Sequence, residues 1–202
     1  GALTCLLAER GYEMIGVDQS AEMLAVAAEK ARTVSGEPPI FLQQSMQRLD
    51  LYGTVDACIC CLDSVNYVTR PADLRRAFQR VHLFLMPGGL FLFDVNTPEK
   101  LRGLDGQAFI DETEDTYCVW RAEWSRRSRT CTYGMDLFFL EENGLWRREE
   151  EVHVERAYEL DELEEMLREA GFTDVRRYGE LKLRAPAAGE QRVFFAARKK
   201  GG

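Results

Sequence analysis

Long apolar runs and histidine are scarce in this 202-residue sequence, and its 26 Lys and Arg residues are outnumbered by 34 Asp and Glu residues. No apolar run reaches the roughly 18 residues that a membrane-spanning helix needs, and no signal peptide is recognisable, so we expect a cytoplasmic protein without a membrane partner. The formal net charge of −8 disfavours an extended nucleic-acid surface, since phosphate binding depends on Lys and Arg. There are only two histidines; His82 is interpreted as structural, and His153 is a weak candidate for a general base.

Cysteine occurs six times, but its placement does not predict a metal site. Cys58, Cys60 and Cys61 lie within one apolar, strand-like run, where free cysteine behaves as a small hydrophobic residue. We therefore expect no bound metal and a reducing compartment.

Helical and strand-like patterns alternate through most of the chain, which is 46% hydrophobic. Residues 55–62 form an apolar run typical of a strand that is covered on both faces in a parallel sheet. Alternation of this kind predicts an α/β fold with a mostly parallel sheet, closed by a terminal antiparallel hairpin. The expected helices after the first cover residues 20–32, 71–85 and 161–170, and the expected strands cover residues 40–42, 55–62, 90–93, 172–178 and 192–197.

The pattern changes to period two between about residues 107 and 158, which predicts antiparallel strands with a hairpin turn at Asn143-Gly144. If that turn pairs Glu142 with Leu145, Tyr133 lies opposite Val154, and His153 shares the other face with Asp136. The expected domains are therefore a core of residues 1–106 and 159–202, and an inserted β subdomain of residues 107–158 that covers the substrate site. Trp120, Trp124 and Tyr133 are expected to build the core of that insertion.

The first residues, GALTCLLAERGYEMIGVDQSAEM, have the pattern of half a nucleotide-binding unit. A helix that Gly11 ends is followed by an apolar run and then by Asp18. In such units a glycine-rich turn precedes the helix, and an acid about 20 positions later binds a ribose diol. Asp18 fits the position of that acid, and Gly1 fits that of the last loop glycine. We expect a first strand and most of the loop to lie upstream. The chain is then expected to bind cofactor weakly or not at all, whereas a version extended upstream by that strand and its loop binds well.

Several motifs in this order resemble the class I S-adenosylmethionine-dependent methyltransferases. They are GALTCLLAERGYEMIGVDQSAEMLAVA, VDACICCLDSVNYV, LMPGGLFLFDVNT and a helix that ends in AGF before a terminal hairpin. The resemblance covers residues 1–100 and 160–198. It implies a Rossmann-like three-layer sandwich, S-adenosylmethionine as cofactor and S-adenosylhomocysteine as product.

The same resemblance assigns cofactor roles to individual residues. Asp18 would bind the ribose hydroxyls, Gln19 and Met23 would border the adenosine, and Ser45 and Met46 would flank the adenine. Ser45 stands where the family often has an acid. The full expected cofactor set is Gly1, Asp18, Gln19, Met23, Ser45, Met46, Cys61, Leu62 and Asp63, the last three along the methionine portion.

Polar residues after two central strands are candidates for holding the methyl acceptor, because open α/β sheets bind ligands at the carboxyl ends of their strands. Asn66, Tyr67 and Asn96 are the expected acceptor-positioning residues, with Asp94 beside Asn96. Methyl transfer from a sulfonium is an in-line displacement in which positioning alone contributes roughly 7–11 kcal/mol. The absence of a recognisable triad therefore does not count against this chemistry.

Two other functions remain open from the sequence. A nicotinamide-dependent oxidoreductase would also use Gly1 and Asp18, although the inserted strands and the terminal hairpin disfavour it. The second alternative is that the chain is truncated and either is inactive or acts only as a binding module. The sequence leaves the methyl acceptor open between an amine, a carboxylate, a hydroxyl and tRNA, although the acidic net charge favours a small molecule. The oligomeric state is undetermined.

Overall fold

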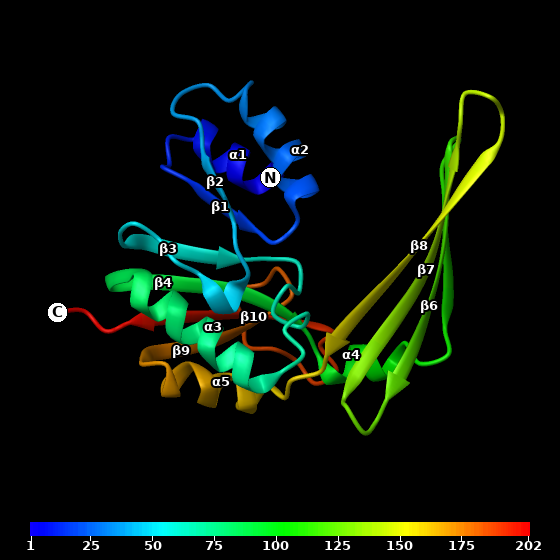
Figure 1. Ribbon diagram of the computed structural model, residues 1–202. Coiled ribbons are helices and arrows are strands. Elements are labelled where there is room, and N and C mark those ends of the chain that lie inside the picture. The colour runs from blue at the N-terminus through cyan, green and yellow to red at the C-terminus, as the bar shows by residue number, and fades with distance from the viewer. The chain divides into compact units, whose positions relative to one another are not determined.

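The computed structural model describes residues 1–202 and divides into two compact units, Gly1–Tyr52 and Gly53–Gly202 (Figure 1). Five α-helices and ten strands, the latter in three sheets, follow one another along the chain, which confirms the α/β class. None of the helices has both the length and the apolar character that a membrane crossing requires.

Unit 1 is a small parallel pair of strands with two helices. Strands β1 (Ile15–Asp18) and β2 (Ile40–Gln43) pair in parallel, and Asp18 lies opposite Gln43. Helix α2 begins where expected, because the Ser20 hydroxyl accepts a hydrogen bond from the Met23 amide at 3.0 Å. The remaining elements of this unit are α1 (Ala2–Glu9), α2 (Ala21–Ala31) and the short 3₁₀ helix η1 (Met46–Arg48).

Unit 2 contains a four-stranded mixed sheet, whereas the sequence predicted a mostly parallel one. Its order is β3-β4-β10-β9, and only the β3–β4 pair is parallel. The terminal hairpin is confirmed: β9 and β10 are antiparallel neighbours. The bounds are β3 (Val55–Cys60), β4 (Leu85–Asn96), β9 (Phe172–Gly179) and β10 (Arg192–Lys199).

One face of this sheet carries the core of unit 2. Helices α3 (Pro71–Phe84) and α5 (Leu160–Glu169) pack on it, and the rings of Phe78, Phe91 and Phe93 meet at centroid distances of 4.9–5.7 Å (Figure 1). The prediction that residues 55–62 form a strand covered on both faces is wrong. Exposed residues lie on both faces of β3, Asp56 on one and Ala57 and Ile59 on the other, and Ile59 is 44% exposed.

Between β4 and α5 the chain forms the short helix α4 (Pro98–Gly103) and an antiparallel sheet that extends away from the mixed sheet (Figure 1). Leu101 of α4 packs against Ala122, Cys131 and Tyr133, with Trp120 and Trp124 at the margin of the cluster. The aromatic residues therefore form a core at the base of this sheet, as expected. The strands are β5 (Ala108–Glu112), β6 (Thr116–Ser125), β7 (Thr130–Leu140) and β8 (Trp146–Arg156).

The predicted register of the β7–β8 hairpin is wrong by one residue. The loop has three residues instead of two: the Glu141 amide donates to the Leu145 carbonyl at 2.9 Å, and Gly144 has φ +81°. A glycine at positive φ in a three-residue loop adds one residue and shifts every later pair. As a result Tyr133 pairs with His153 and Asp136 pairs with Glu150, so His153 and Asp136 lie on opposite faces.

Candidate functional site

The turn after β3 has a strained backbone. Leu62 and Asp63 have φ values of +59° and +49°, a left-handed conformation that side chains with a Cβ rarely adopt. Leu62 is 76% exposed, whereas Asp63 is turned inward. Such strain persists only where neighbouring contacts hold it, and it is common at ligand sites.

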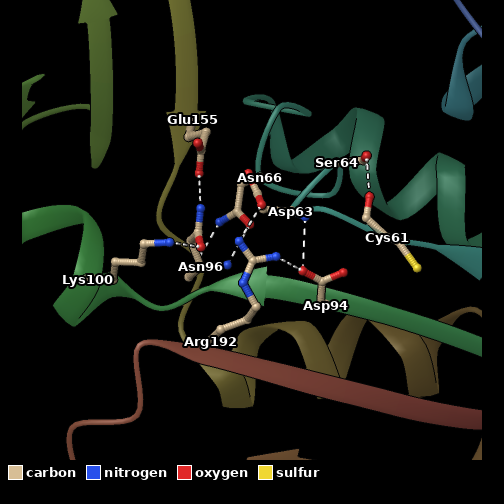
Figure 2. Close-up of polar contacts among 9 residues, drawn as sticks. All are labelled: Cys61, Asp63, Ser64, Asn66, Asp94, Asn96, Lys100, Glu155 and Arg192. Atoms are coloured by element: carbon tan, nitrogen blue, oxygen red, sulfur yellow. Dashed lines mark hydrogen bonds and ion pairs between the residues drawn. The ribbon is translucent and has the colours of Figure 1, made fainter. Parts of the chain in front are cut away.

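Arg192 of β10 provides the contacts that hold this turn. Its Nη2 donates to Asp63 Oδ1 at 2.8 Å, and its Nη1 donates to Asp94 Oδ2. The Asp63 amide donates to the same Asp94 oxygen at 3.1 Å (Figure 2). Asp94 is 1% exposed, so its charge is compensated by these donors rather than by water.

Asn66, which follows the turn, is fully buried and is saturated by main-chain atoms. Its Nδ2 donates to the carbonyl oxygens of Asn96 and Arg156, each at 3.0 Å, and its Oδ1 accepts from the Asn96 amide at 3.0 Å. Asn66 thus joins the ends of β4 and β8, which are far apart in the sequence. Its side chain has no donor left for a ligand, so Asn66 can affect a methyl acceptor only by fixing the strand ends around it.

The side chain of Asn96 connects a cation with an anion. Its Oδ1 accepts from Lys100 Nζ at 2.8 Å, and its Nδ2 donates to Glu155 Oε2 at 2.8 Å (Figure 2). Glu155 lies near the end of β8 and is 4% exposed. Burial raises the pKa of Glu155 to about 7; the negative charge of Asp63 adds to the increase, while hydrogen bonds from Asn96 and Tyr133 and the charge of Lys100 oppose it.

Tyr67 and His153 lie at the more exposed side of this cluster. Tyr67 is 44% exposed, and its ring meets that of His153 edge to face at a centroid distance of 5.9 Å. Burial, followed by the charges of Glu155 and Asp63, raises the pKa of Tyr67. His153 Nε2 is 3.0 Å from Glu151 Oε2. His153 and Glu155 are two positions apart on β8 and therefore project from the same face as Tyr133.

In unit 1 the structure gathers the expected adenosine-binding residues at the carboxyl edge of the β1–β2 pair. The Gln44 amide donates to the Asp18 carbonyl at 2.9 Å, and Gln43 Nε2 donates to the Gln19 carbonyl at 3.1 Å. These bonds bring the residues after β1 beside Ser45 and Met46, at the start of η1. Met23, on the first turn of α2, is 56% exposed.

The residues of unit 1 fit the adenosine portion of S-adenosylmethionine. Asp18 is exposed, and only its Oδ1 is engaged, by the Ser20 amide at 3.0 Å, so the other oxygen is available to a diol. A Cβ added to Gly1 would lie 2.4 Å from the Cβ of Ala27, so only glycine allows the start of α1 to approach α2 this closely. In unit 2, Cys61 and Leu62 are exposed beside Asp63, whose carboxylate is engaged with Arg192.

Sequence reasoning missed three members of the polar cluster: Arg192, Lys100 and Glu155. Arg192 and Glu155 lie 98 and 59 residues from the Asp94 and Asn96 side chains that they contact, so no local motif connects them. Lys100 is four residues from Asn96 in the sequence. Thr97-Pro98 is a typical helix start, and it could have predicted the short helix that brings Lys100 to Asn96. A hollow of about 490 Å³ on the β4–β10–β9 face, next to Leu92, Phe194 and Tyr178, includes none of the expected site residues.

Comparisons with known proteins point to one family. A family profile described as "Methyltransferase domain" matches residues 1–89. "Putative methyltransferase YqeM" of Bacillus subtilis (strain 168) is 33% identical over 201 residues, which cover 98% of this chain and 80% of that protein.

Solved structures have the same fold. The crystal structure of an S-adenosylmethionine-dependent methyltransferase from Clostridium acetobutylicum ATCC 824 superposes with a TM-score of 0.86 at 25% identity, covering 94% of this chain and 76% of that one. For CalS10 of Micromonospora echinaspora, described as an amino pentose methyltransferase and solved with S-adenosylmethionine bound, the TM-score is 0.71 at 21% identity, covering 93% of this chain and 74% of that one.

Proposed function

This chain belongs to the class I S-adenosylmethionine-dependent methyltransferases and uses S-adenosylmethionine as its cofactor, and we propose that it methylates a small-molecule acceptor by in-line displacement. The observation that carries the proposal is the polar cluster of unit 2. It lies where β3, β4 and β8 end, and Tyr67 and His153 border it. A site of this kind can orient one acceptor group through several fixed polar atoms.

We propose that the cofactor roles implied by the family resemblance hold residue by residue for this chain. Asp18 accepts hydrogen bonds from the ribose hydroxyls, with Gln19 and Met23 beside the adenosine and Ser45 and Met46 beside the adenine. Cys61, Leu62 and Asp63 border the methionine portion, and Gly1 allows the close approach of α1. When bound, the cofactor supplies a methyl group activated by its sulfonium.

The residues of this chain then act by positioning. Asn66 and Asn96 fix the ends of β4 and β8, and Tyr67 offers a half-exposed ring and hydroxyl to the acceptor. Holding acceptor and methyl carbon in line contributes roughly 7–11 kcal/mol to lowering the barrier. The sheet β5–β8, within the proposed insertion of residues 107–158, borders this side of the site with Tyr133 and Glu155.

A small acceptor is supported by the net charge of −8, which disfavours RNA, and by the description of CalS10, which acts on an amino pentose. To test the proposal, the protein is incubated with methyl-labelled S-adenosylmethionine and either a panel of small amines, alcohols and carboxylic acids or bulk tRNA. We expect label in one small-molecule class, with an equal amount of S-adenosylhomocysteine formed. Label in tRNA alone would contradict the small-molecule proposal.

A further inference from the structure

We infer that Glu155 is the proton acceptor of the methylation reaction and that the acceptor is a primary or secondary amine. The inference rests on the proposed function and goes beyond it by naming the substrate class. It starts from one unusual feature of the polar cluster, namely a buried carboxylate with no ion pair.

The surroundings of Glu155 leave its negative charge without a direct cationic partner. It is 4% exposed and accepts a hydrogen bond from the neutral amide of Asn96 at 2.8 Å. Lys100, the nearby cation, is bonded instead to the oxygen of that same amide at 2.8 Å. This differs from Asp94, whose buried carboxylate is paired directly with Arg192. A carboxylate held among neutral donors is able to receive either a proton or a cationic ligand.

The other groups around Glu155 favour a cationic ligand. Asp63, from the turn after β3, adds negative charge, and the hydroxyls of Tyr133 on β7 and Tyr67 are neutral because burial raises the pKa of each. Cys131 of β7 is a buried thiol whose pKa burial also raises. Lys100 of α4 acts on the carboxylate as a cation, while Arg192 of β10 is paired with Asp63 and Asp94. An ammonium group would thus meet an acidic site.

The half-exposed ring of Tyr67 lies close enough to Glu155 for the carboxylate charge to raise the Tyr67 pKa, so such a ligand would meet this ring beside the carboxylate. Tyr67 packs against His153, and His153 and Glu155 project from the same face of β8. Aromatic rings attract ammonium groups through the negative charge of their faces, so the ring offers a first contact before the carboxylate. His153 lies next to Glu151 at 3.0 Å, which adds a further acid at this side.

The chemistry balances without any other reactant. The Glu155 carboxylate takes one proton from the ammonium group, which leaves a neutral amine with a free lone pair. The lone pair forms the new N–C bond to the methyl carbon while the C–S bond breaks and its electron pair goes to sulfur. The products are S-adenosylhomocysteine and a methylated ammonium, and protonated Glu155 releases its proton to solvent. A pKa of about 7 suits a base that works at neutral pH.

The test is a carboxyl titration followed by NMR on the full chain labelled with [¹³Cδ]glutamate. The Glu155 signal is assigned as the one missing from the Glu155→Gln spectrum. We expect it to titrate near pH 7 in sodium chloride and about half a unit or more lower in methylammonium chloride of equal ionic strength, because an opposite charge favours the carboxylate. The same midpoint in both salts, or a midpoint near that of an exposed glutamate, would overturn the inference.

The matched control is Glu150→Gln, an exposed glutamate on the opposite face of β8. In that variant the Glu155 signal should respond to methylammonium as in the wild type. In transfer assays with the pair benzylamine and benzyl alcohol, we expect label in the amine alone. Glu155→Gln should lose at least about 100-fold in rate, the lower end of the range for acid–base catalysis. Label in the alcohol would overturn the inference but leave the proposed function intact. A methylammonium response without transfer to any acceptor would instead count against the proposed function.

Discussion

Arg192 connects the strained turn after β3 to the end of β4 through two ion pairs. It pairs with Asp63 and Asp94, whose side chains are 15% and 2% exposed. Arg192→Met would leave two acids facing each other without a cation, so we expect a loss of unfolding free energy on the order of 3 kcal/mol. Urea denaturation measures it. Arg176→Met, which removes an exposed pair with Asp174, is the control and should have little effect. Equal losses in the two variants would contradict the role of Arg192.

Glu155 should also make stability depend on pH. Its pKa in the folded protein is about 7, above the ordinary value of 4.5. The folded state therefore binds this proton more tightly, so the stability that Glu155 contributes is complete below about pH 4.5 and is lost as pH rises to about 7. Replacement by Gln removes that loss, on the order of 3 kcal/mol. Denaturation of both proteins at pH 4.5 and pH 8 measures it, and a constant difference between them would contradict the shift.

Among single residues, the sequence predicted the polar residues at or after the ends of β3 and β4. Asp63, Asn66, Asp94 and Asn96 lie together as their positions at the strand ends suggested. Glu155 was not predicted because the sequence of β8 is that of an exposed, charged strand. Only the fold shows that Glu155, near the end of β8, is buried between half-buried neighbours. Whether the expected cofactor and acceptor residues act as proposed stays a prediction.

Among the elements, the turn after β3 is where backbone strain and proposed function coincide. Leu62 is exposed at φ +59°, so Leu62→Gly should remove strain and raise the unfolding free energy by about 0.5–1 kcal/mol, net of the entropy lost by glycine. Leu183→Gly is the control: Leu183 is 96% exposed and has no positive φ, so glycine there should be destabilising. Thermal unfolding measures both. A less stable Leu62→Gly protein would show that the turn is not strained.

The sequence predicted most elements but not the details that tertiary contacts decide. Capping by Ser20 and the start of α3 at Pro71 are local signals, and both are confirmed. The β7–β8 register depended on whether Gly144 belongs to a two-residue or a three-residue loop, which composition alone does not decide. Helix α4 was missed because six residues are too few for a periodic signal.

For the whole molecule, α/β alternation indicated the fold class, while strand direction followed from pairings distant in the sequence. β10 lies between β4 and β9 and is antiparallel to both, so the sheet of unit 2 is mixed. Antiparallel pairing of β10 also places Arg192 opposite Asn96 and so completes the polar cluster. Chain topology, more than any motif, therefore assembles the proposed acceptor site.

The central claim is that this fold uses Asp18 to hold the adenosine of S-adenosylmethionine for methyl transfer. Titration calorimetry tests this claim with S-adenosylhomocysteine and, separately, with NADH. The proteins are the wild type, Asp18→Ala and the control Glu13→Ala, because Glu13 is an exposed acid in the loop before β1. We predict that S-adenosylhomocysteine binds and NADH does not. Asp18→Ala should weaken binding about 10- to 100-fold, because it loses charge-assisted hydrogen bonds, and Glu13→Ala should bind as the wild type does. Binding of NADH alone, or equal affinities in the two variants, would contradict the account.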